Sequence, residues 1–146
     1  EVNDNKNLTF RNSIIGPDMN PNGIGLFNWF MKQTGTINGY GSVYWTGVTT
    51  LTLAKAMEKA IEEDLTGIYN LVNNTSISKL EMLQEFKKAF NKDIIINENN
   101  DLKIAKTLVN TRDDFSFIVP SYQEMIKEMA EWVFSHKQLY KHYFGE

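Results

Sequence analysis

The clearest periodic pattern in the chain runs from Thr50 to Val72. Apolar residues recur in its first half at the spacing of one helix face: Leu53, Ala54, Met57, Ala60 and Ile61. Polar residues fill most of the other positions, and the hydroxyl of Thr49 or Thr50 can cap the first turn. Gly67 ends the helical region, and the sequence from Ile68 to Val72 is typical of a short buried strand.

Two further helices are predicted by a serine followed three residues later by glutamate. Ser78 with Glu81, and Ser121 with Glu124, each match the capping box, in which each side chain bonds the other residue's backbone N–H. Apolar stripes follow both boxes: Leu80, Leu83, Phe86 and Phe90 in the first helix, and Tyr122, Met125, Ile126, Met129 and Val133 in the second. The aromatic-rich segment from Leu26 to Gln33 predicts a shorter helix.

Strand candidates alternate with these helices. They lie at Leu8 to Arg11 and Asp93 to Ile96, and the glycine-rich stretch from Thr34 to Ser42 is a loop or a short strand. Asn97 to Asp101 is expected to be a polar turn, and Ile104 to Phe117 to be extended and irregular. Alternating strands and amphipathic helices favour an α/β fold, with residues 1–146 forming a single domain.

Composition narrows the functional classes. The net charge of −3 argues against a nucleic-acid or anionic membrane surface, and no apolar run approaches the length of a membrane span. The chain has no cysteine, which excludes disulfides and thiol chemistry and fits a cytoplasmic location. It opens on Glu1 in charged, asparagine-rich sequence, so we expect a fragment of a longer protein.

Recognisable catalytic motifs are missing from the sequence. It contains no Tyr-x-x-x-Lys pair and no complete glycine-rich phosphate loop, because Gly39-x-Gly41 is only half of one. The two histidines, His136 and His142, lie on different helix faces, so no metal site is expected. We therefore assign no catalytic residue.

Two groups of side chains are candidates for binding. Trp29, Tyr40, Tyr44 and Trp45 could line a cleft suited to a sugar or a base, or they could be core aromatics. Arg112, with lysines upstream, could hold a diphosphate, or it could pair with a neighbouring aspartate at the surface. The sequence leaves both alternatives open.

Several short motifs occur in a familiar order. They are RNSIIGP from Arg11, LFNWFMKQ from Leu26, GVTTLTLA from Gly47, GIYNL from Gly67 and ISKLE from Ile77. In this order the chain, from about Leu8 to Tyr143, resembles the C-terminal half of an extended short-chain dehydrogenase/reductase, closest to the dTDP-4-dehydrorhamnose reductase group.

The resemblance implies roles for particular residues. Ser13 would lie beside the nicotinamide end of the cofactor, and the helix that contains Asn28 would border the nucleotide of the substrate. Lys106 to Arg112 would lie near the nucleotide phosphates. Tyr44 to Gly47 departs from the G-x-P-T type sequence of the rhamnose reductases, so the sugar is left open. Tyr44 and Trp45 are nevertheless kept as substrate-binding candidates.

The resemblance also implies a function for the intact protein. It would transfer a hydride from NAD(P)H to a 4-keto nucleotide sugar, with NAD(P) and the Tyr/Lys pair held by an N-terminal Rossmann domain that this chain lacks. The alternatives are a nucleotide-sugar epimerase, a non-catalytic binding or regulatory member of the same fold, or a freestanding α/β interaction domain. Strand edges and apolar surface left without cover would make the fragment a homodimer.

Overall fold

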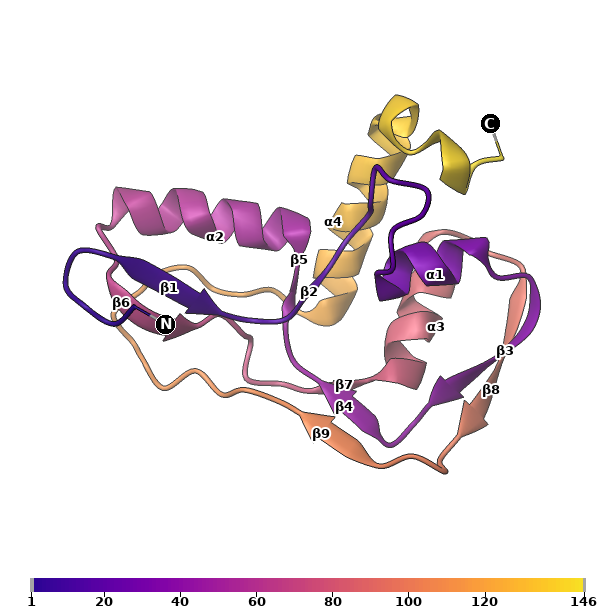
Figure 1. The fold of residues 1–146 in the computed structure, drawn as a ribbon, viewed down its shortest axis with the longest axis horizontal. Coiled ribbons are helices and arrows are strands. Elements are labelled where there is room, and N and C mark those ends of the chain that lie inside the picture. Colours follow the sequence, from indigo (N-terminus) through magenta and orange to yellow (C-terminus); the bar gives the residue numbers. More distant parts are fainter. Residues whose placement is uncertain (1, 146) are drawn as a thin grey trace.

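The computed structural model describes residues 2–145 as four α-helices and nine short strands (Figure 1). This mixed α/β architecture confirms the fold class predicted from the alternating sequence pattern. None of the helices in this part of the chain is long and apolar enough to cross a membrane.

One parallel strand pair joins distant parts of the sequence. Strand β1 (Leu8–Arg11) pairs along its whole length with β6 (Gly67–Asn70). The backbone N–H of Gly67 donates to the carbonyl of Asn7 at 2.7 Å, and that of Leu71 donates to Arg11 at 3.0 Å. Strand β1 has the predicted bounds, whereas β6 begins one residue earlier than predicted and ends at Asn70, so Leu71 and Val72 lie outside it. Among residues 2–145, β1 has no strand on its second edge.

Three smaller sheets complete the strand topology. Strand β2 (Ile14–Ile15) pairs in parallel with β5 (Val48–Thr49). Strand β3 (Gly35–Tyr40) pairs in parallel with β8 (Ile94–Asn99). Strand β4 (Val43–Trp45) lies between β7 (Ile77–Ser78) and β9 (Ile104–Lys106).

The predicted polar turn at Asn97 to Asp101 is wrong, because β8 continues to Asn99. The partner strand explains the difference. Strand β3 offers six residues in register, from Gly35 opposite Ile94 to Tyr40 opposite Asn99. Ladder hydrogen bonds from a partner of this length hold polar residues in a strand even where local composition favours a turn.

Helix α2 (Thr50–Glu62) begins as predicted, since Thr49 is its N-cap and accepts from the Thr52 N–H at 3.2 Å. The face predicted to be buried is largely wrong. The helix buries three small residues, which are Thr52, Ala56 and Ala60. Of the predicted face only Ala60 is buried; Met57 is 51% exposed and Ile61 is 78% exposed.

Neighbouring elements explain which face of α2 is covered. The small residues let α2 approach α4 (Tyr122–Ser135) and β5 closely, and Lys55 forms an ion pair with Glu128 of α4 at 2.8 Å. The larger apolar residues of α2 instead border an open hollow with β1. We call this surface the apolar strip: Leu8, Phe10, Leu53, Met57 and Ile61. Within this strip Met57 and Ile61 are exposed, while Leu8, Phe10 and Leu53 are partly buried against the core.

The other two long helices confirm their sequence signatures. Both α3 (Lys79–Ala89) and α4 have complete capping boxes, with Ser78 and Ser121 as N-caps. Every residue of the two predicted apolar stripes is buried. The chain ends in two short 3-10 helices, Lys137–Leu139 and Lys141–Tyr143, where the sequence predicted one or two further turns.

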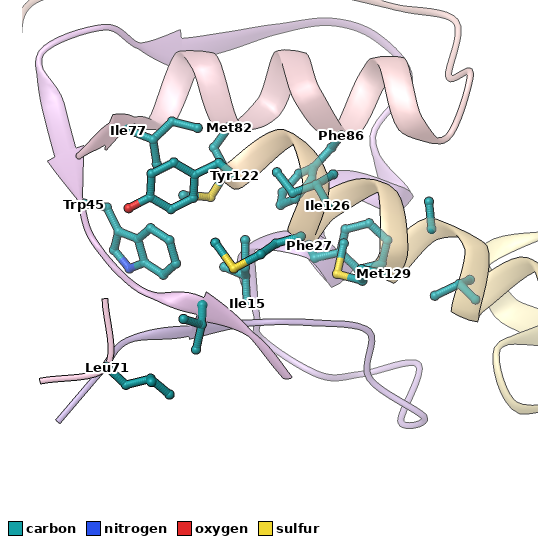
Figure 2. Packing of buried hydrophobic residues seen from close by; sticks show 14 of the residues in the cluster. Ile15, Phe27, Trp45, Leu71, Ile77, Met82, Phe86, Tyr122, Ile126 and Met129 are labelled. Atoms are coloured by element: carbon teal, nitrogen blue, oxygen red, sulfur yellow. The ribbon is translucent and has the colours of Figure 1, made fainter. Parts of the chain in front are cut away.

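The aromatic core lies where α1 (Leu26–Lys32), α3 and α4 meet (Figure 2). Phe27 contacts Phe86 edge-on at 5.2 Å between ring centroids, and Phe30 contacts Phe86 at 5.6 Å. Ile126 and Met129 of α4 fill the same cluster, each 1% exposed. Packed aromatic pairs add stability beyond their buried area. The core therefore fixes α1, α3 and α4 as one unit.

Substituting Ser121→Ala tests the cap of α4. Loss of the hydroxyl that accepts from the Glu124 N–H should lower the free energy of unfolding by about 1 kcal/mol. Urea denaturation followed by circular dichroism measures this change. Ser76→Ala is the matched control, because Ser76 is exposed and makes no hydrogen bond within residues 2–145. Equal stability of the two variants would contradict a capping role.

Candidate functional site

An open hollow runs along β1 and past its carboxyl end. It is lined by residues 9–13 on one side and by residues 105–108 on the other, and its volume is about 750 Å³. We call it the strand-end hollow. The carboxyl ends of parallel strands are where α/β proteins place their ligands, because backbone groups and loop side chains meet there. Ser13 and Lys106, predicted separately from sequence, both line this hollow.

Next to the hollow, the backbone at Ser13 packs closely against the backbone at Gly47 and Val48. The carbonyl of Ser13 accepts from the Val48 N–H at 3.0 Å. A Cβ on Gly47 would lie 2.2 Å from that carbonyl oxygen and 2.4 Å from the ring of Trp45. No residue larger than glycine fits there without displacing one of them. Gly47 therefore brings Ser13 and Trp45 together.

Trp45 points into the core and is only 7% exposed. Its ring lies 6.0 Å from that of Tyr122 (Figure 2). Tyr44 is 43% exposed and, as the next residue of the strand, points to the opposite face. It lies in register with Ala105, which lines the strand-end hollow. The structure thus makes Trp45 a core aromatic and leaves Tyr44 accessible beside the hollow.

Sequence reasoning did not single out Lys79, the first residue of α3. Its ammonium lies 5.5 Å from the centre of the Trp45 ring, which is a cation–π contact. Burial, and then repulsion from Lys106, lower the pKa of Lys79 below its ordinary value of 10.5. Lys106 itself lies opposite Trp45 in the β4–β9 register. The ISK motif contained Lys79, but only the tertiary packing places it beside Trp45.

Asn28 is fully buried in α1 and organises the preceding loop. Its Nδ2 donates to the carbonyl of Gly23 at 2.5 Å and to that of Pro21 at 3.4 Å. Its Oδ1 is buried with no hydrogen-bond partner. The amide therefore holds the loop against α1 and lies away from the residues that line the strand-end hollow.

Arg112 is engaged with backbone and carboxylate groups. Its Nε and Nη2 donate to the carboxylate of Asp114, and its Nη1 donates to the carbonyls of Thr66 at 2.8 Å and Ile68 at 2.9 Å. The hydrogen bonds with Asp114 raise the pKa of Arg112 and lower that of Asp114. This is the paired arrangement that the sequence left open as the alternative to diphosphate binding.

These contacts also protect a strand edge. Gly67 and Leu71 direct their N–H groups toward β1, so the carbonyls of Thr66 and Ile68 face the opposite edge of β6. The guanidinium of Arg112 satisfies both carbonyls, as a neighbouring strand would. Of the residues predicted from sequence to bind substrate or cofactor, Ser13 and Lys106 share the hollow, with Tyr44 beside it. Arg112 lies on the far edge of β6.

No protein-family model matches the sequence, and no curated protein sequence matches it. Comparison with solved structures gives strong matches. The dTDP-4-dehydrorhamnose reductase of Bacillus anthracis, solved with NADP, matches with a TM-score of 0.65 at 15% identity, over 85% of this chain and 47% of its own.

Other sugar-nucleotide enzymes match as well. A UDP-N-acetylglucosamine 4-epimerase of Methanobrevibacter ruminantium, in complex with UDP-N-acetylmuramic acid, gives a TM-score of 0.62 at 18% identity, over 88% of this chain and 45% of its own. A dTDP-glucose 4,6-dehydratase of Bacillus anthracis, in complex with NAD, gives a TM-score of 0.62 at 14% identity. The match covers 93% of this chain and 47% of the dehydratase. The chain spans less than half the length of each of these proteins.

Replacing Arg112 with methionine should destabilise the fold. The substitution leaves the carbonyls of Thr66 and Ile68 without their charged donor, at a cost of about 1–3 kcal/mol of unfolding free energy. Chemical denaturation measures this loss. Lys103→Met is the control, since Lys103 is exposed and forms no ion pair within the described chain. An unchanged free energy of unfolding in Arg112→Met would contradict a stabilising role for the hydrogen bonds from Arg112 to the edge of β6.

The structural matches and the sequence motifs lead to one conclusion about architecture: this chain has the fold of about half of an extended short-chain dehydrogenase/reductase.

Proposed function

We propose that this chain is the substrate-binding part of a nucleotide-sugar oxidoreductase. The observation that carries the proposal is the strand-end hollow, which joins Ser13 and Lys106 at the carboxyl end of a parallel strand pair. Solved structures with this fold include enzymes complexed with nucleotide sugars and with NAD or NADP. Ser13 would face the nicotinamide end of the cofactor, and Lys106 and Tyr44 would face the substrate.

In the intact protein, a dinucleotide-binding half would supply the cofactor and the catalytic pair. Such a half would hold NAD(P), which supplies the hydride, and the Tyr-x-x-x-Lys pair that the sequence does not contain. The residues of this chain would orient the nucleotide sugar and shield it from water. We place the protein in the cytoplasm, in keeping with its cysteine-free composition.

The apolar strip and the open edge of β1 would form the contact with that half. Exposed Met57 and Ile61 on α2 lie next to Leu8 and Phe10 of β1, and β1 lacks a second strand neighbour among residues 2–145. A sheet that continued through β1 would cover both features at once. In the isolated chain, a second copy would cover them instead, giving a two-fold homodimer.

The reaction we favour is reduction of a 4-keto nucleotide sugar. The order of the short motifs resembles the dTDP-4-dehydrorhamnose reductase group most closely. Epimerisation is the second candidate, because UDP-N-acetylglucosamine 4-epimerases of Methanobrevibacter ruminantium and Bacillus cereus have this fold at similar TM-scores of 0.62 and 0.63. The two reactions share a substrate class and differ in what the dinucleotide-binding half does with it.

Titration of dTDP-glucose and UDP-glucose into the isotopically labelled chain tests the proposal. Backbone resonances of residues 11–13 and 105–108, which line the strand-end hollow, should shift, while those in the exposed last turn of α4 should not. Free glucose is the control ligand. The same chain should oxidise no NADPH with a 4-keto nucleotide sugar. Nucleotide sugars that shift no resonance of the hollow, or turnover by this chain alone, would contradict the proposal.

A further inference from the structure

The sequence contains two Asn-Gly pairs in contrasting surroundings. Asn22-Gly23 lies in the loop between β2 and α1, and Asn38-Gly39 lies inside β3. An asparagine side chain can react with the backbone nitrogen of the residue that follows it, and glycine obstructs this approach least because it has no side chain. Asparagine is for this reason among the thermolabile residues of proteins. Because both pairs share the same local chemistry, the fold decides which of them reacts.

Asn22 is exposed and lies in a turn outside the helices and strands of the fold. Its side chain makes no hydrogen bond to any residue in the part of the chain that the structure describes. The backbone N–H of Gly23 donates to the carbonyl of Asn20 at 3.0 Å, and Asn20 is itself exposed. Because this single bond can open to solvent without disturbing the core, the nitrogen of Gly23 is able to reach the side-chain carbon of Asn22.

Asn38 is exposed as well, but its backbone is held in a ladder. Gly39 is buried, and a Cβ there would lie 2.8 Å from the Leu80 side chain, so β3 packs tightly against α3. The N–H of Gly41 donates to Asn99 of β8 at 3.1 Å, and the alternation of a parallel ladder directs the Gly39 N–H to the same strand. Reaction at Asn38 therefore requires β3 to separate from β8 and has to wait for partial unfolding.

We infer that Asn22 is a site of spontaneous deamidation and that the fold protects Asn38 from the same reaction. In the first step the nitrogen of Gly23 bonds to Cγ of Asn22, the bond from Cγ to Nδ2 breaks, and ammonia leaves with the proton of Gly23. Water then opens the cyclic imide. Breaking the bond to Cγ gives aspartate, and breaking the bond to the main-chain carbonyl carbon gives isoaspartate. The reaction consumes only water and adds one negative charge to the loop.

The isoaspartate product disturbs a buried anchor of the loop. Nδ2 of the fully buried Asn28 donates to the carbonyl of Gly23 at 2.5 Å and to that of Pro21 at 3.4 Å, so one amide joins the two sides of the reactive residue. Isoaspartate adds one backbone atom between these two carbonyls and shifts one of them away from the amide. Aspartate leaves the backbone length unchanged. Deamidation therefore loosens the loop from α1 only by the isoaspartate route.

Peptide mapping of the aged chain tests the inference. The folded protein is kept at neutral pH and body temperature, digested with trypsin, and analysed by liquid chromatography and mass spectrometry. The two pairs fall on different tryptic peptides, residues 12–32 and 33–55, because cleavage follows Arg11, Lys32 and Lys55. We expect deamidation at Asn22 to be at least about tenfold faster than at Asn38, and to yield both aspartate and isoaspartate. Equal rates, or a faster reaction at Asn38, would overturn the inference.

Two controls separate the effect of the fold from that of the local sequence. In concentrated urea the two pairs should deamidate at rates within about threefold of each other, because both then lie in an unfolded backbone. A difference in urea as large as that in the folded chain would contradict protection by the fold. Asn22→Gln should remove the reaction from peptide 12–32, since glutamine must close a larger ring, whereas the matched Asn38→Gln should leave that peptide unchanged. Deamidation of peptide 12–32 that persists in Asn22→Gln would show that Asn22 is not the site.

The side-chain amide of Asn28 reports the structural consequence. Asn22→Asp carries the charge of the product on an unaltered backbone, so the NMR resonances of its Asn28 amide should stay close to those of the unreacted chain. In the aged wild-type chain a second set of Asn28 amide resonances should appear, with an intensity that matches the isoaspartate fraction found by peptide mapping. A single unshifted set in a sample rich in isoaspartate would overturn the predicted loss of the anchor.

Discussion

The parallel pairing of β1 with β6 is the interaction on which the rest of the structure depends. It joins residues about sixty positions apart, and its hydrogen bonds run from Asn7 at one end to Leu71 at the other. Loop closure on this scale is unfavourable, so the pair must be held by what packs around it. Helix α2 covers one side, and the ring of Tyr69 on β6 contacts Phe10 on β1 edge-on at 6.0 Å (Figure 1).

The two outer edges of this strand pair differ in their hydrogen-bond partners. The guanidinium of Arg112 satisfies carbonyls on the outer edge of β6. The outer edge of β1 has no strand partner in residues 2–145 and borders the apolar strip. The carboxyl end of the same pair opens into the strand-end hollow. The strand pair thus has one edge satisfied by Arg112, one edge without a strand partner among residues 2–145, and the strand-end hollow at its carboxyl end.

Local signals in the sequence were sufficient for much of the secondary structure. Ser78 and Ser121 start helices because a capping box acts within four residues, and the stripes behind them are buried because a helix with one apolar face has one way to cover it. Helix α2 shows the limit of this reasoning. Its bulky apolar face is exposed, because α4 and β5 contact the side that carries Ala56 and Ala60.

The candidate site was predictable only in part. Ser13 came from a motif of the family resemblance and Lys106 from the segment that it places near the nucleotide phosphates, and the fold brings both to one hollow. Arg112 matched the same resemblance loosely, but Asp114 and two carbonyls bind its guanidinium instead. Lys79 could not be singled out from the sequence. Its contact with the Trp45 ring and the effect of Lys106 on its pKa arise only in the folded chain, between residues that are distant in sequence. Contacts between elements, rather than residue types, decide which side chains form the site.

If the apolar strip and the open edge of β1 need a partner surface, the isolated chain should self-associate. Light scattering across a dilution series of the chain tests it most directly. We expect a dimer at high micromolar concentration, and a monomer at the same concentration when Met57 and Ile61 are both replaced by lysine. Glu58→Lys, on the exposed polar side of α2, should remain dimeric. A wild-type chain that is monomeric at high micromolar concentration would contradict the claim.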